Sequence, residues 1–119
     1  MYLAMGQVPV ILGNVEKNLQ SMEDAIKEVT NKNNKKIDLI AFPELFVTGY
    51  NLRDNYNSVS EKIPSKGPAQ KGMLALAEKY NITILSGIVE RSQKSLFNSA
   101  IMIGPEGYIG HYQKHFLPN

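Results

Sequence analysis

A carboxylate directly follows the most apolar strand that the sequence predicts. Residues 38–42 read DLIAF, which is typical of a buried strand, and Pro43 and Glu44 come next with no cation beside them in sequence. Proline cannot donate a hydrogen bond to a neighbouring strand, so Pro43 marks the end of this one. A carboxylate withdrawn from water at a strand end is well suited to take a proton from an attacking nucleophile. Glu44 is therefore a candidate general base, provided that it is buried.

A second charge occupies a similar place near the other end of the chain. Residues 108–113 indicate the last strand, and Lys114 follows at its carboxyl end. On regular strands Glu44 shares a face with Phe42, and Lys114 shares one with Tyr112 and Tyr108. Ligands of α/β proteins gather beyond the carboxyl ends of strands, so the two charges could converge there as a base and a cation for a developing oxyanion. Charges at strand ends are more often merely solvated, so position alone does not decide the matter.

Hydrophobic periodicity defines the elements that must position these charges. Residues 2–10 are apolar and short, which indicates a strand. Asn14 is a helix-capping residue, and apolar residues then recur at steps of three and four from residue 15 to about residue 30, which indicates a helix. With the strand at 37–42, this order predicts a parallel strand pair joined by a right-handed helical crossover.

The second half of the chain reads as one helix followed by an antiparallel meander. The predicted elements are an irregular stretch at 49–66 with a helical turn near Asp54, a helix from Gly67 and Pro68 to Asn81, strands at 82–89 and 97–103, and turns at 91–94 and 104–107. The predicted fold class is therefore α/β, in one domain without internal repeats.

Composition limits the classes of function. The chain has 119 residues, of which 43% are hydrophobic and 20% charged, so one packed domain is expected. A net charge of +2 with dispersed basic residues does not favour nucleic acid, and no apolar run reaches membrane length. The absence of cysteine excludes disulfides, thiolate metal sites and a cysteine nucleophile within these residues. These features predict a soluble cytoplasmic protein.

Three segments in a fixed order resemble the nitrilase, or carbon–nitrogen hydrolase, superfamily. They read DLIAFPELFVTGY, GPAQKGMLALAEKYNITILSGIVER and LFNSAIMIGPEGYIGHYQKHFLPN, and with Gln7 and Asn18 the resemblance covers nearly the whole chain. It implies a nitrilase-like α-β-β-α sandwich of two sheets. Residues 1–119 would form only the N-terminal portion of this single domain, leaving the packing face of one sheet and a sheet edge exposed.

The resemblance also implies a mechanism based on a glutamate, a lysine and a cysteine. Glu44 matches the general base and Lys114 the cation that steadies the tetrahedral intermediate, whereas the cysteine would lie beyond residue 119. Residues 1–119 alone should therefore be inactive. Tyr50 resembles a substrate-binding aromatic that lines the pocket, although ordinary packing explains it equally well. The implied chemistry needs no metal and no organic cofactor.

The resemblance leaves the specific activity open. The leading expectation is an amidase-type hydrolase of a small-molecule amide or nitrile substrate, assembled as a homo-oligomer. One alternative is the glutaminase domain of a glutamine-dependent NAD synthetase, which HFLPN resembles. Another is a non-catalytic protein that keeps the fold for binding or assembly. His111 and His115 are spaced i, i+4 but fall at a strand end, so we predict no metal site there, and Asn98 is expected to make a structural hydrogen bond.

Overall fold

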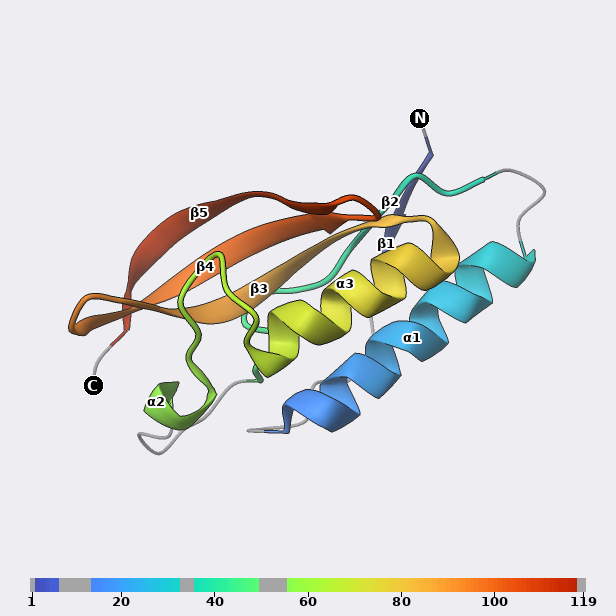
Figure 1. Ribbon diagram of the computed structural model, residues 1–119. Helices are drawn as coiled ribbons and strands as arrows, with labels where there is room; N and C mark the ends of the chain where they lie inside the picture. The colour runs from blue at the N-terminus through green and yellow to red at the C-terminus, as the bar shows by residue number, and fades with distance from the viewer. Residues whose placement is uncertain (1, 7–13, 33–35, 50–55, 118–119) are drawn as a thin grey trace.

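The computed structural model describes residues 2–6, 14–32, 36–49 and 56–117. Within them lie one sheet and three helices (Figure 1). The strands are β1 (Leu3–Met5), β2 (Leu39–Ala41), β3 (Thr83–Ser92), β4 (Ser95–Gly104) and β5 (Gly107–Leu117), and the helices are α1 (Val15–Lys32), α2 (Tyr56–Val59) and α3 (Pro68–Tyr80).

The sheet changes character halfway across. Its strand order is β1-β2-β3-β4-β5, with β1, β2 and β3 parallel to one another and the last two junctions antiparallel. The predicted parallel start and antiparallel meander are therefore confirmed for the described residues. A helix connects each pair of parallel neighbours, because a chain that must return to the same end of a sheet needs a crossover.

Helices α1 and α3 lie side by side on one face of the sheet (Figure 1). The apolar stripe of α1 buries Met22 and Ile26, and that of α3 buries Met73, against Ile84 and Ile88 of β3. Each such side chain contributes on the order of 1.5–3 kcal/mol when it leaves water. This helix-covered side is the main core. None of the described helices is long and apolar enough to span a bilayer.

The predicted start of α1 and both predicted ends of α3 are confirmed. The Oδ1 atom of Asn14 accepts a hydrogen bond of 3.0 Å from the backbone N–H of Lys17, which satisfies a free donor of the first turn. Helix α3 starts at Pro68 and stops at Asn81, whose left-handed φ of 50° ends the helix. Helix α1 continues to Lys32, slightly beyond the predicted end.

The strand boundaries differ more from the prediction. Strand β2 is limited to Leu39–Ala41, and β1 to Leu3–Met5 within the described residues. Strands β3 and β4 are longer than predicted because their hairpin turns at residues 93 and 94 alone, with Gln93 at a φ of 57°. Strand β5 likewise extends past Gln113. The helical turn that was expected near Asp54 lies at α2, and Asp54 itself is outside the described residues.

The second face of the sheet has no helix on it among the described elements (Figure 1). The large apolar side chains of Leu3, Met5 and Tyr112 are exposed there, Met5 to 72%. Nearby, Leu85 and Met102 line a shallow apolar depression. We call this side of the sheet the open face.

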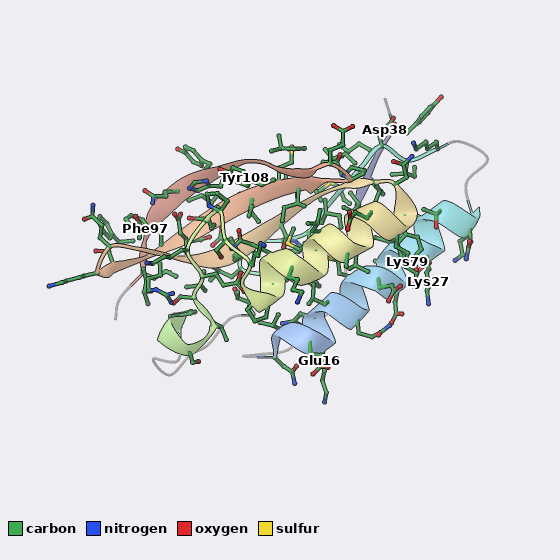
Figure 2. All side chains as sticks on the ribbon, viewed as in Figure 1. Glu16, Lys27, Asp38, Lys79, Phe97 and Tyr108 are labelled. Atoms are coloured by element: carbon green, nitrogen blue, oxygen red, sulfur yellow. The ribbon has the colours of Figure 1, made fainter. Side chains whose placement is uncertain are left out.

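An ion cluster joins the outer surfaces of the two large helices. Glu23 of α1 accepts hydrogen bonds at its Oε2 atom from Lys79 Nζ at 2.8 Å and from the Tyr80 hydroxyl at 2.6 Å. Lys27 lies close enough to act on the same carboxylate, and Figure 2 shows it near Lys79. The hydrogen bonds from Lys79 and Tyr80 hold the pKa of Glu23 below its ordinary value, while the hydrogen bond to Glu23 raises the pKa of Lys79 and of Tyr80.

We predict that Glu23→Gln removes part of the stability that the protein has at neutral pH. Because the pKa of Glu23 is lowered by folding, its contribution is present above the ordinary glutamate value of about 4.3 and is lost as the pH falls through the lower folded value. Urea unfolding between about pH 7 and pH 3 should show wild type and variant converging in acid. Glu28→Gln is the control, since its pair with Lys32 is highly exposed and should contribute little at any pH. A difference between wild type and Glu23→Gln that is independent of pH would contradict the prediction.

A buried carboxylate fixes the start of α3. Glu61 is only 5% exposed, and its carboxylate accepts hydrogen bonds from the backbone N–H groups of Ala69 at 2.6 Å and Gln70 at 3.3 Å, and from Gln70 Nε2 at 2.9 Å. The positive end of the helix dipole favours this arrangement. Gly67 is needed beside it, since a β-carbon there would overlap the Glu61 side chain. Glu61 therefore anchors α3 to the sheet.

We predict that Glu61→Gln lowers the free energy of unfolding by about 1–3 kcal/mol, because an amide cannot accept these bonds with both of its terminal atoms. Thermal and urea unfolding measure the loss. Glu78→Gln, an exposed change on the same helix, should alter stability by less than about 0.5 kcal/mol. Equal stabilities of the two variants would show that the Glu61 carboxylate does not anchor α3.

Candidate active site

The chain turns sharply where Glu44 stands. After β2 ends, residues 44–48 form a turn in which the Phe46 N–H donates to Pro43 O at 3.2 Å and the Gly49 N–H donates to Leu45 O at 2.7 Å. Leu45 has a left-handed φ of 54°. The expectation that Glu44 continues the alternation of a regular strand is therefore wrong, because β2 stops at Ala41 and the turn resets the direction of the side chains.

The residues around Glu44 anchor the turn. Phe42 and Phe46 are buried in the main core with their ring centroids 5.0 Å apart, and Leu45 packs into a separate small cluster with Val89. The Glu44 side chain itself is 42% exposed. The burial expected of a general base at this position is therefore not found, because Glu44 lies toward the open face. The flanking apolar side chains hold the backbone while the carboxylate stays accessible.

Lys114 stands at an irregularity between β4 and β5. Ser99 pairs with Gln113 and Asn98 pairs with His115, so Lys114 is the extra residue of a β-bulge. Such bulges redirect a side chain and increase the local twist. Lys114 also lies inside β5 rather than at its end.

A second irregularity lies earlier in β5 and changes which side chains share a face. Tyr108 pairs with Ile103, whose side chain packs in the helix-covered core, whereas Gly110 pairs with Met102 on the open face. The prediction that Tyr108 and Lys114 follow a single alternation along one face is therefore wrong, because each bulge shifts the alternation by one residue.

Glu44 and Lys114 nevertheless meet. The Lys114 Nζ atom lies 3.5 Å from Glu44 Oε2, although the two residues are 70 positions apart in sequence. Both side chains are 42% exposed, so solvent weakens their attraction. The predicted convergence of a carboxylate and an ammonium is present in the structure. Tyr50 and Gln7, which were also singled out from the sequence, lie outside the described residues.

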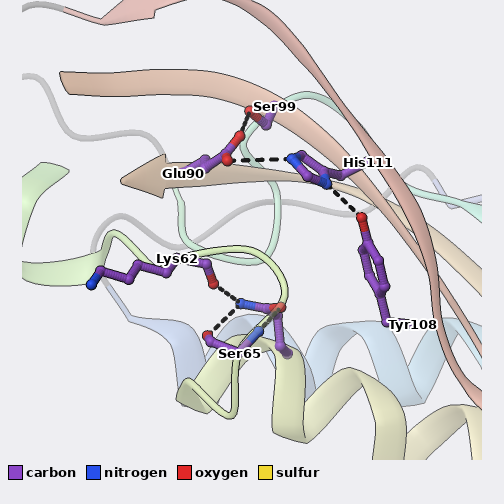
Figure 3. Close-up of polar contacts among 7 residues, drawn as sticks. Lys62, Ser65, Glu90, Ser99, Tyr108 and His111 are labelled. Atoms are coloured by element: carbon purple, nitrogen blue, oxygen red, sulfur yellow. Dashed lines mark hydrogen bonds and ion pairs between the residues drawn. The ribbon is translucent and has the colours of Figure 1, made fainter. Parts of the chain in front are cut away.

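A row of linked polar side chains, which the sequence did not predict, crosses the helix-covered side of β3, β4 and β5. The carboxylate of Glu90, only 3% exposed, accepts a 2.7 Å hydrogen bond from Ser99 Oγ and lies 3.3 Å from His111 Nε2. His111 Nδ1 is in turn 2.6 Å from the Tyr108 hydroxyl (Figure 3). The only sequence signal was a glutamate and a serine inside apolar strands. These linked side chains connect three strands and lie on the opposite side of the sheet from the open face.

No metal site emerges from the described part of the chain. Across residues 2–6, 14–32, 36–49 and 56–117, His, Asp and Glu side chains nowhere gather in groups of three that could hold an ion. Independently of this, a carboxylate next to an ammonium is a pair of groups that suits proton transfer and the stabilisation of a developing negative charge.

Comparisons with known proteins place this geometry in a family. The profile of the carbon-nitrogen hydrolase family matches residues 2–119. A nitrilase from Pyrococcus abyssi is 35% identical over 104 residues, which cover 86% of this chain and 38% of that protein. A glutamine-dependent NAD(+) synthetase from Acinetobacter baylyi is 32% identical over 123 residues, covering 98% of this chain and 20% of the synthetase.

A solved structure shares the fold. The crystal structure of an N-terminal amidase with a Gln-Gly peptide superposes with a TM-score of 0.81 at 27% identity, covering 98% of this chain and 28% of the amidase. The present chain thus spans well under half the length of the relatives that it matches and only part of the nitrilase-type fold. Since the family profile extends over nearly every residue and the described strands follow the same architecture, this chain belongs to the carbon–nitrogen hydrolase family.

Proposed function

We propose that residues 1–119 form the N-terminal portion of a single carbon–nitrogen hydrolase domain that cleaves amide bonds of small molecules. The observation that carries this proposal is the 3.5 Å approach of Lys114 Nζ to Glu44 Oε2 at the open face. Glu44 acts as the general base and Lys114 as the cation that stabilises the oxyanion. Tyr50 is proposed to line the substrate pocket.

The proposed reaction proceeds in two halves. Glu44 takes the proton of a thiol, the thiolate attacks the amide carbon, and the carbonyl oxygen becomes an oxyanion beside the Lys114 ammonium. The carbon–nitrogen bond then breaks, and the leaving amine takes the proton from Glu44. Water attacks the resulting thioester while Glu44 accepts its proton, and that proton returns to the thiolate as the acid is released.

The nucleophile in this proposal is a cysteine beyond residue 119, because the 119 residues contain none. The buried serines nearby do not replace it. Ser86 is buried and donates to the carbonyl oxygen of Gly87 at 3.0 Å, and Ser99 donates to Glu90 on the other side of the sheet. A serine committed in this way is not available to Glu44.

An amide substrate suits this site better than a nitrile. Attack on an amide carbonyl creates an oxyanion, which a neighbouring ammonium stabilises directly. The amidase crystallised with a Gln-Gly peptide supports the same choice, although the Pyrococcus relative is named a nitrilase. The cytoplasmic location and the homo-oligomeric state stay predictions from the sequence.

We predict that Glu44→Gln and Lys114→Ala in the full-length protein each lower kcat/KM for a small amide by at least about a hundredfold. Glutamine keeps the shape of glutamate but cannot accept the thiol proton, and alanine removes the cation. Ammonia or amine release measures the turnover. Near-normal rates in either variant would remove that residue from the mechanism. Lys71→Ala, which changes an exposed lysine of α3, is the control and should keep full activity.

The same two variants should keep their fold. Because both side chains of the pair are 42% exposed, its loss should change the free energy of unfolding by less than about 1 kcal/mol. Circular dichroism during thermal unfolding measures this. An inactive variant that is also strongly destabilised would point to a structural role for the pair instead.

A second candidate is the glutaminase portion of a larger synthetase. The match to the Acinetobacter glutamine-dependent NAD(+) synthetase covers 98% of this chain and favours this candidate. Turnover of glutamine well above that of other primary amides would support the glutaminase. Absence of turnover for every amide and nitrile, with the fold intact, would favour a non-catalytic binding or assembly protein.

A further inference from the structure

The turn that contains Glu44 is hydrogen-bonded to the edge of β3 that faces β2. Beyond the end of β2, the Phe42 N–H still donates to Leu85 O at 2.8 Å. The Gly87 N–H then donates to Pro43 O, and the Val47 N–H donates to Gly87 O, both at 3.2 Å. Gly87 thus binds the chain on both sides of Glu44 through its own backbone.

Gly87 also lies in direct contact with the Glu44 backbone. A β-carbon at this position would overlap the backbone nitrogen of Leu45 and would lie 2.6 Å from Glu44 C and 2.7 Å from Glu44 Cα. The atoms that it would meet are backbone atoms, which cannot swing aside as the tip of a flexible side chain can. Any larger residue at position 87 must therefore lift the turn away from β3.

Thr48 adds a second point of attachment. Its Oγ1 atom accepts a 3.0 Å hydrogen bond from the Val89 N–H, and Thr48 is fully buried. The next backbone group of β3, Val89 O, accepts from the Glu61 N–H at 3.0 Å. The turn is therefore confined between β2 and Glu61 along this edge of β3.

The β-ladder relates this attachment to Lys114. Gly87 pairs with Ala100 of β4, which pairs with Tyr112 of β5. Two residues further along β3, Val89 pairs with Asn98, which pairs with His115. The bulge that contains Lys114 falls between these two rows. Strands β3 and β5 are two strand spacings apart, or about 9.5 Å, and Lys114 rises from β5 close to the level at which the Glu44 turn contacts Gly87 of β3. Two long side chains can close that gap only while the turn stays seated on β3.

We propose that Gly87 and Thr48 are positioning residues that set the distance from the Glu44 carboxylate to the Lys114 ammonium. This inference rests on the proposed function. The absence of a side chain at Gly87 lets the turn sit directly on β3, and the Thr48 hydroxyl fixes its far end. Neither residue takes part in the chemistry.

The main experiment is Gly87→Ala in the full-length protein, assayed for amide hydrolysis. Displacing the Glu44 backbone should lower kcat by about 10–100-fold and change KM by less than about threefold, because misplacing a reacting group by roughly 1 Å has an effect of this size. Folded Gly87→Ala with kcat within about twofold of wild type would overturn the proposal. A loss of kcat/KM of the same size that comes entirely from a higher KM, with kcat unchanged, would overturn it as well.

A matched pair at Thr48 decides the question if Gly87→Ala does not fold. Thr48→Val keeps the shape of the side chain but cannot accept from the Val89 N–H, so kcat should fall by roughly threefold or more. Thr48→Ser keeps the hydroxyl and should restore wild-type kcat. Wild-type kcat in Thr48→Val, or an equal loss in both Thr48 variants, would contradict a positioning role.

Two controls separate positioning from general destabilisation and from failure of the proposed function. Ile26→Val removes a buried methyl group of α1, so it should lower the melting temperature without changing kcat. If Ile26→Val lost as much kcat as Gly87→Ala, the loss would be explained by lower stability alone, and the proposal would be overturned. If Glu44→Gln is inactive while the Gly87 and Thr48 variants keep wild-type kcat, the positioning inference alone fails. Normal turnover in Glu44→Gln refutes the proposed function itself.

Discussion

The structure depends on one constraint at the edge of β3 that faces β2. Because β2 is much shorter than β3, the backbone N–H and carbonyl groups of β3 beyond the end of β2 need other hydrogen-bonding partners. Strand β3 covers Thr83–Ser92, whereas β2 covers only Leu39–Ala41. Buried N–H and carbonyl groups are rarely left unpaired, so other segments must continue the edge. The turn at residues 44–48 does so first, and Glu61 follows. The candidate base therefore lies in the segment that replaces β2 as the hydrogen-bonding neighbour of β3.

The open face explains why the site is exposed in spite of this support. Helices cover one side of the sheet, while Met5 and Tyr112 on the other side remain in contact with solvent. Both members of the Glu44–Lys114 pair lie in high dielectric, where two opposite charges 4 Å apart attract by only about 1 kcal/mol. Excluding water from this side of the sheet would strengthen the attraction several-fold without moving either residue.

The sequence predicted those features that depend on local pattern. The apolar period of α1, the Asn14 cap, the Asn81 stop and the parallel start of the sheet each follow from neighbouring residues. The bulge at Lys114 did not, because a bulge is a property of the register between two strands and not of either strand alone. The meeting of Lys114 with Glu44 was predicted from strand ends, yet the actual route runs through a turn and a bulge.

Three glutamates show why burial by itself does not identify a base. Glu61 and Glu90 are almost fully buried, and hydrogen bonds from helix α3 and from Ser99 hold them in place, which suits structural anchors. Both carboxylates thus take part in contacts that connect one element of the fold to another. Glu44, by contrast, makes only one contact of this kind within the described residues, the 3.5 Å approach of Lys114. Of the three carboxylates, it is the one that the described fold leaves accessible, which suits the role proposed for it.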